Sequence, residues 1–114
     1  MQARKLDLAD YPLNHIVIPG GGHPQYDVRG SLSALCFVPE LQLNGTALMQ
    51  MQEIAKAILD CPDQSILLNE QDWQKLKRAC EVHVGFTRAE VELVRRVTEA
   101  VTVEVQEATQ EIQT

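Results

Sequence analysis

Apolar residues recur at three- and four-residue steps through residues 68–100, and this spacing predicts two helices joined by a tight turn. The first helix has one apolar stripe, formed by Trp73, Leu76, Ala79, Cys80 and His83. Asn69 stands where an N-cap belongs, with Asp72 three residues later. Gly85 is placed to end this helix, because glycine adopts the left-handed conformation without strain.

The second helix of this pair opens with Thr87 and Glu90 at capping-box spacing. Its predicted inward face consists of Val91, Val94, Val97, Thr98 and Val101. Two apolar pairs flank the caps and predict hydrophobic staples, Leu68 with Trp73 and Phe86 with Val91.

A third helical pattern begins near residue 47, with Asn44 or Thr46 as its cap. One stripe contains the apolar residues Leu48, Met51, Ile54, Ala55, Ile58 and Leu59. Pro62 ends the helix.

Residues 28–38 fit two patterns. Asp27 is placed to cap a helix with Val28 and Leu32 on one face, but the same run also alternates like a strand. We favour the helix because Asp27 is a good cap and Ser31 and Ser33 suit a strand poorly. Pro39 stops either element.

Short β-prone runs complete the pattern. The largely apolar run Ser65–Leu68 is a strand or an extended entry into the helix capped by Asn69, while Val101–Val105 either continues the last helix or forms a strand. The density of β-branched residues favours the strand, paired with Ile16–Ile18 or with Ile66–Leu67.

Residues 1–25 differ from the rest and predict an extended N-terminal arm with one short strand, Ile16–Ile18, and a glycine hinge at Gly20–Gly22. A helical domain follows over residues 26–105, and residues 106–114 form a polar tail. The expected fold is mainly α, with α+β as the alternative: about four short helices with two or three short strands.

Composition narrows the classes of function. The chain has 114 residues, enough for one domain, and a formal net charge of −6 that argues against binding to a nucleic-acid backbone. No apolar run approaches the roughly 20 residues needed to cross a bilayer, so we expect no membrane partner. Three cysteines without CxxC spacing indicate a reduced, intracellular protein.

Candidate chemistry is sparse. The run from Gly20 to His23 matches neither GxxxxGK nor GxGxxG, which a phosphate-binding loop needs. Cys80 and His83 have the spacing of two metal ligands, but no further ligands lie nearby in the sequence. No motif surrounds a Cys–His pair with an orienting carboxylate. We therefore expect no catalytic residue, cofactor or metal.

Arg88, Arg95 and Arg96 form a local basic strip on the last helix of an otherwise acidic protein. Glutamates interleave with them, so the strip is either a salt-linked surface or a docking surface for an acidic protein or a nucleic acid.

Four motifs give the chain a recognisable order: Asp27-Val28-Arg29, Leu41-Gln42-Leu43-Asn44-Gly45, the segment 67–77 around Trp73, and the segment 85–97 from Gly85-Phe86 to Val97. Over about residues 27–100 this order resembles small structural or accessory proteins encoded by tailed bacteriophages and prophages. The resemblance implies a capsid, connector or tail accessory component, a homo-oligomer located in the virion or in the host cytoplasm.

The predicted function is therefore non-enzymatic assembly through protein–protein contacts, with Ile16, Val17 and Ile18 of the arm docking on a neighbouring subunit. The alternative is a small phage-encoded regulator that binds a host protein through the basic face of Arg88, Arg95 and Arg96.

Overall fold

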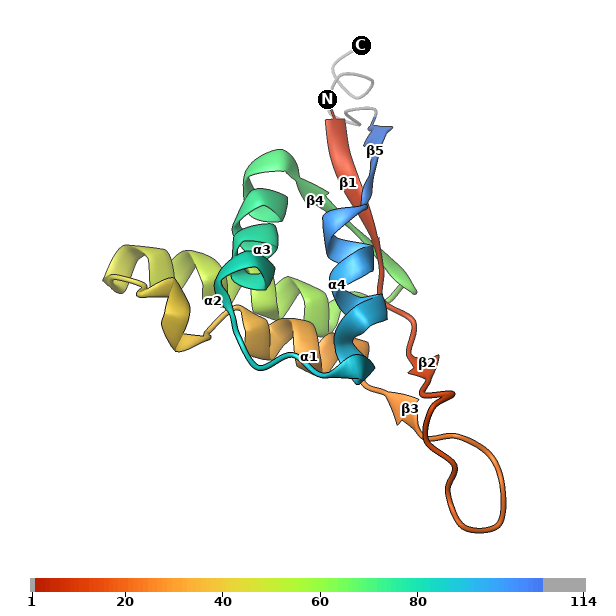
Figure 1. Ribbon diagram of the computed structural model, residues 1–114. Helices are drawn as coiled ribbons and strands as arrows, with labels where there is room; N and C mark the ends of the chain where they lie inside the picture. The colour runs from red at the N-terminus through yellow and green to blue at the C-terminus, as the bar shows by residue number, and fades with distance from the viewer. Residues whose placement is uncertain (1, 106–114) are drawn as a thin grey trace.

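The structure, a computed structural model, describes residues 2–105. Within that range the elements are β1 (Gln2–Asp7), β2 (Tyr11–Pro12), β3 (Gln25–Tyr26), α1 (Val28–Leu35), the 3₁₀ turn η1 (Pro39–Leu41), α2 (Gly45–Asp60), β4 (Ser65–Asn69), α3 (Glu70–Val82), the 3₁₀ turn η2 (Arg88–Glu90), α4 (Val91–Thr98) and β5 (Val101–Glu104). Helices and strands share one body (Figure 1), so the fold is α+β, and the expectation of a mainly α fold is corrected to that alternative.

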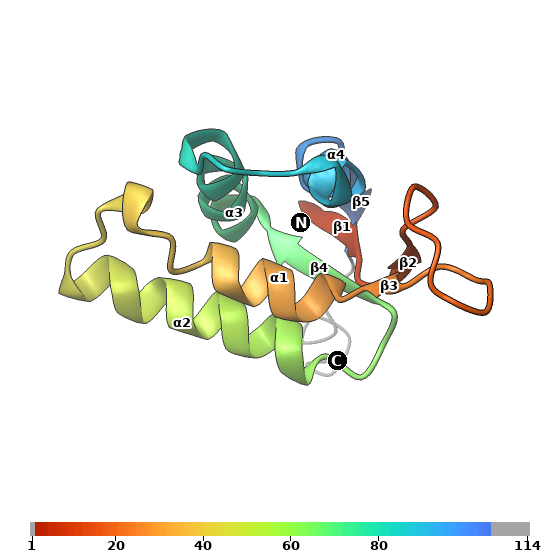
Figure 2. The ribbon, with the colours of Figure 1, turned by 60° about the horizontal axis from the view of Figure 1, so that its bottom comes forward.

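A three-stranded antiparallel sheet, in the order β4-β1-β5, forms the centre of the body. The register places Lys5 of β1 opposite Leu67 of β4 and Val101 of β5. Leu6 and Leu68 face the core and are buried. Helices α3 and α4 lie over this sheet, while α1 and α2 pack on each other beside it (Figure 2).

The N-terminal arm predicted over residues 1–25 is wrong for Gln2–Asp7, because this segment is the central strand of the sheet. The sequence of this strand lacks the alternation of apolar and polar residues, because Arg4 occupies the inward position two residues before Leu6. The Arg4 guanidinium lies 3.7 Å from the Trp73 ring centroid and donates hydrogen bonds to Glu70 and to the carbonyl of Ala100. A charged residue with these partners fits where an aliphatic one is expected.

Two of the three predicted strands are confirmed, β4 and β5, but their pairing differs from the prediction. Both pair with β1, so β5 contacts neither Ile16–Ile18 nor β4. Ile16–Ile18 is a loop segment in the structure and not a strand.

The predicted helix N-termini are confirmed by their hydrogen bonds. The Asp27 carboxylate accepts from the Gly30 amide at 3.1 Å, which confirms a helix after residue 27. Asn44 caps α2 through the Ala47 amide at 2.8 Å, and Asn69 caps α3 through Asp72 at 2.7 Å. The capping box of Thr87 and Glu90 is also formed.

The predicted inward face of the last helix is wrong in part. Leu93 and Val97 are buried, whereas Val91 and Val101 are exposed, so Phe86 and Val91 do not form a buried staple. Leu93 takes the inward position that was assigned to Val91, and Val101 lies in β5, beyond the end of α4 at Thr98. Gly85 has φ +98°, but α3 already ends at Val82, so this glycine shapes the linker.

Other apolar positions of the predicted stripes also lie outside the core. In α2, Met51, Ile54 and Ile58 are buried, but Leu48 and Leu59 are exposed. No helix within residues 2–105 combines the length and the apolar character required to span a bilayer.

Long-range polar contacts hold the layers together. Trp73 of α3 donates its indole N–H to the carbonyl of Val97 in α4 at 2.8 Å. Arg29 of α1 donates to the carbonyls of Ile58, Cys61 and Asp63 at 3.0, 2.6 and 2.6 Å. These carbonyls lie at the C-terminal end of α2, where backbone acceptors lack helical partners and a cation is favoured.

We expect Arg29→Met to destabilise the protein by about 1–3 kcal/mol, because three carbonyls lose a charged donor while the aliphatic stem is kept. Urea unfolding measures the change. Lys56→Met is the matched control, since Lys56 is exposed and forms no hydrogen bond or ion pair with the described residues. Equal midpoints for the two variants would show that the Arg29 contacts contribute no stability.

Candidate functional site

A hairpin projects from the body at the end opposite to the tip of β5 (Figure 1). Its stem is the antiparallel pair β2–β3, with Tyr11 opposite Tyr26 and Pro12 opposite Gln25. The Leu13 amide donates to the carbonyl of Pro24 at 2.8 Å, which closes the base of the loop. We call residues 11–26 the hairpin, and Ile16, Val17 and Ile18 its tip.

The stem is fixed to the body by aromatic and polar contacts. The rings of Tyr11 and Tyr26 stack with centroids 5.0 Å apart, and the Tyr11 hydroxyl donates to the carbonyl of Ala89. The guanidinium carbon of Arg96 lies 5.0 Å from the Tyr11 ring centroid. The base of the hairpin is therefore anchored to η2 and α4.

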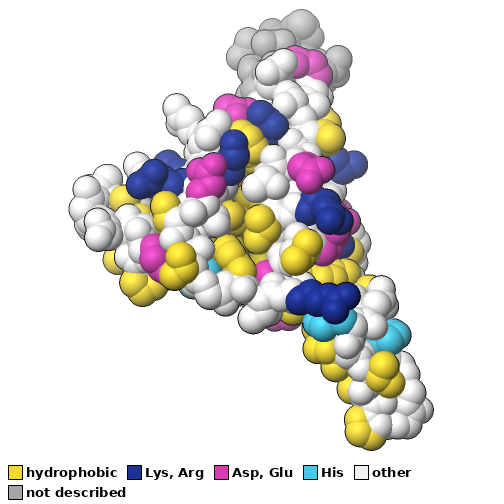
Figure 3. Space-filling view, in the orientation of Figure 1, with side chains coloured by type: hydrophobic (Ala, Val, Ile, Leu, Met, Phe, Trp, Pro, Cys, Tyr) yellow, Lys and Arg dark blue, Asp and Glu magenta, His cyan; other side chains and the backbone are white. Residues whose placement is uncertain are grey.

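The tip presents three aliphatic side chains to solvent. Ile16, Val17 and Ile18 are 40%, 71% and 43% exposed. Hydrophobic surface follows the projecting hairpin in Figure 3. Exposed aliphatic residues on a projecting loop are a candidate contact surface, because burying them on binding is favourable.

The three glycines belong to the turn beyond the tip, so the predicted hinge between arm and body is corrected. Gly20, Gly21 and Gly22 have φ values of +93°, +99° and +87°, which disfavour residues with a side chain. The Gly21 amide donates to Ile18, and the Ile18 amide donates to Gly22, at 3.0 and 3.2 Å. His23 Nδ1 lies 2.6 Å from the Ile16 carbonyl oxygen. These bonds give the loop a defined shape.

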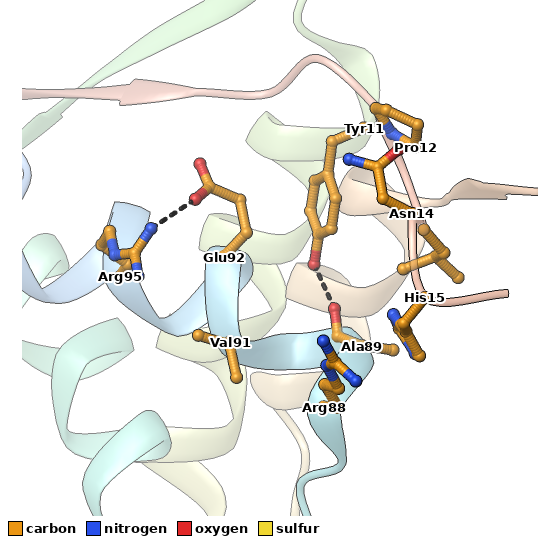
Figure 4. A pocket seen from close by; sticks show the side chains of 10 residues that line it. Tyr11, Pro12, Asn14, His15, Arg88, Ala89, Val91, Glu92 and Arg95 are labelled. Atoms are coloured by element: carbon orange, nitrogen blue, oxygen red, sulfur yellow. Dashed lines mark hydrogen bonds and ion pairs between the residues drawn. The ribbon is translucent and has the colours of Figure 1, made fainter. Parts of the chain in front are cut away.

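A groove of about 540 Å³ lies between the hairpin base and α4 (Figure 4). Tyr11, Pro12, Leu13, Asn14 and His15 line it from the hairpin, and Arg88, Ala89, Val91, Glu92 and Arg95 line it from η2 and α4. In Figure 4, Val91 lies between Arg88 and Arg95, and His15 lies near Arg88.

The groove carries a net positive charge, because two arginines and one glutamate line it. Arg88 is exposed and makes no hydrogen bond or ion pair with any residue of the described part of the chain. Arg95 is exposed and contacts Glu92 at 3.2 Å and Glu99 at 4.0 Å, geometries that contribute little at a surface. Val91, 53% exposed, adds an apolar surface between the two arginines.

Arg96 lies apart from this surface. Its side chain is only 14% exposed and donates to the carbonyl of Ala9 at 2.6 Å and to Glu92 at 3.0 Å. It also approaches Asp7 at 3.8 Å. The structure therefore brings Arg88 and Arg95 together in the groove and uses Arg96 to attach the segment after β1 to α4.

The cysteines and His83 have other environments. Burial raises the pKa of the Cys36 thiol to about 12 and that of Cys80 to about 11, which keeps both protonated at neutral pH. His83 Nδ1 lies 3.1 Å from Glu40 Oε1, and this hydrogen bond lowers the pKa of the Glu40 carboxyl. Among residues 2–105, no three His, Cys, Asp or Glu side chains gather in a way that could hold a metal ion.

Comparison of the chain with protein families, with curated proteins and with solved structures finds no match in any of the three.

Tyr11 gives a test of the hairpin anchor. Burial, then the nearby Tyr26, raises the pKa of Tyr11 to about 12, against about 10 for a free tyrosine. The unfolded chain ionises first, so stability that is complete below about pH 10 falls as the pH rises toward the folded pKa.

We therefore expect near-ultraviolet absorbance to show delayed tyrosine ionisation in the folded protein, and Tyr11→Phe to flatten the loss of stability at alkaline pH. Tyr26, whose pKa burial also raises, accounts for the residual slope. Ionisation of both tyrosines at the ordinary pH would mean that the stem does not pack as described.

Proposed function

We propose that this protein is a non-enzymatic assembly component of the kind encoded by tailed bacteriophages, such as a capsid, connector or tail accessory protein. It acts in the host cytoplasm or in the virion, and the hairpin tip docks on a neighbouring subunit. The observation that carries the proposal is the exposure of Ile16, Val17 and Ile18 on a loop that projects from the body.

The geometry favours docking by this tip. Internal hydrogen bonds close the loop and its stem is anchored, so binding orders few additional residues. Full burial of an aliphatic side chain contributes about 1.5–3 kcal/mol, and the tip side chains are already partly covered. The tip therefore supplies a few kcal/mol at most, which suits an anchor within a larger interface of about 800 Å² per partner.

The second candidate function is regulation of a host protein through the basic face. Arg88, which has no hydrogen-bond or ion-pair partner among residues 2–105, lies beside Arg95 and favours this function, since its guanidinium can bind a partner carboxylate. Arg96, occupied within the fold, is not part of this surface. If this function holds, reversal of the charges of Arg88 and Arg95 abolishes recovery of a host protein and leaves the fold intact.

The tip proposal is tested by substitution, because deletion of residues 1–22 would also remove the central strand β1. We expect the variant Ile16→Ser, Val17→Ser, Ile18→Ser to fold normally and to assemble at least about tenfold more weakly, the effect of losing about 1.4 kcal/mol. Sedimentation velocity measures the mass of the assembly, and circular dichroism reports the fold.

The matched control replaces three exposed apolar residues elsewhere, Leu48→Ser, Met49→Ser and Val84→Ser. We expect this variant to assemble like the parent protein. Parent-like assembly of the tip variant would refute docking by the hairpin.

A further inference from the structure

The two ends of the molecule differ in chemistry. The body and hairpin together measure 60 × 33 × 22 Å, and the groove lies at the hairpin end. β5 runs to the other end, and residues 105–114 follow it in the sequence (Figure 1). An elongated molecule with different ends can form contacts between the head of one copy and the tail of the next.

The lining of the groove defines what it binds. The guanidinium of Arg88 lacks a partner within residues 2–105, and that of Arg95 contacts the partly exposed Glu92 and the exposed Glu99. Val91 between them and Pro12 on the facing wall provide apolar surface. An occupant that matches the guanidinium groups and the apolar surface carries carboxylates beside aliphatic side chains, since carboxylates form strong hydrogen bonds with guanidinium groups.

The chain contains a segment with this chemistry. After Arg96 it has no basic residue, and residues 105–112 combine Glu107 and Glu111 with the apolar residues Val105, Ala108 and Ile112. Residues 106–114 lie outside the described part of the structure. The segment is thus complementary to the groove in charge and in apolar content.

We propose that the groove binds residues 105–112 of a second copy of the chain. Glu107 and Glu111 pair with Arg88 and Arg95, and the aliphatic residues of the segment cover Val91. The inference rests on the proposed function, because it identifies the neighbouring subunit as another copy and adds a second contact to that of the tip.

The segment reaches the groove of another copy more readily than its own. α4, eight residues long, rises about 12 Å, and β5, four residues long, about 13 Å. The two elements follow one another toward the far end of the body (Figure 1). From Arg95, midway along α4, the remaining rise to the end of β5 is about 18 Å, or roughly five extended residues, so Glu107, three positions after β5, falls short of its own groove.

A charge-swap experiment tests the inference. The groove variant carries Arg88→Glu and Arg95→Glu, the tail variant carries Glu107→Arg and Glu111→Arg, and the double variant carries all four. We expect each single-site variant to assemble at least about tenfold more weakly in sedimentation equilibrium. The double variant restores assembly, because each reversed groove meets a reversed tail.

The control variant is Lys56→Glu with Arg78→Glu, which reverses two exposed charges that have no hydrogen-bond or ion-pair partner in residues 2–105. We expect this control variant to assemble like the parent protein. Circular dichroism of every variant tests for unfolding. This check is needed because Arg95→Glu places a third negative charge beside Glu92 and Glu99.

Three results would overturn the inference. These are a double variant that stays dissociated, a parent protein that is monomeric at every concentration, and a groove variant that loses a host protein while self-assembly is unchanged.

The tip variant, with serine at residues 16–18, distinguishes the groove contact from docking by the tip. If the charge swap fails while the tip variant still dissociates, the hairpin contact stands alone. If the swap succeeds and the tip variant assembles normally, the groove contact stands alone.

Discussion

The fold depends on one inward-facing charge, the guanidinium of Arg4 on the central strand. It stacks on Trp73 and donates hydrogen bonds to the carboxylate of Glu70 and to the backbone carbonyl of Ala100. One side chain thereby connects β1 with α3 and with the segment that enters β5. Trp73 in turn bonds to α4, so the sheet and both helices above it share a single polar junction at the edge of an aliphatic core.

The parts of the fold that the sequence predicted well are those with local signals. Asp27, Asn44 and Asn69 bond to amides only three residues away, so their role is visible in a short window. The central strand was missed because Arg4 occupies an inward position whose partners lie far along the chain. The inward face of α4 was misassigned because Val91, Leu93 and Val94 are all apolar, so their spacing alone does not select Leu93 over Val91.

In the candidate site too, features with a local sequence signal were predicted better than features that depend on distant residues. The aliphatic run at residues 16–18 was predicted to be a strand in an extended arm, whereas the structure places it in an exposed loop of a hairpin. The groove could not be predicted, since Tyr11 and Ala89 are 78 positions apart and meet only in the fold. Arg96 was grouped with Arg95 in the sequence, yet adjacent residues point about 100° apart on a helix, and the two side chains serve different surfaces.

The conformation of Gly20 and Gly21 restricts how this loop can change. Both have positive φ angles, and no atom lies within 4 Å of the place where a side chain would begin. Crowding therefore does not exclude substitution, whereas the handedness of L-amino acids does. A D-alanine introduced by chemical synthesis would fit this backbone and would reduce the freedom of the unfolded chain. The loop backbone therefore accommodates a change of side chain at residues 16–18, whereas it resists any L-side chain at Gly20 and Gly21.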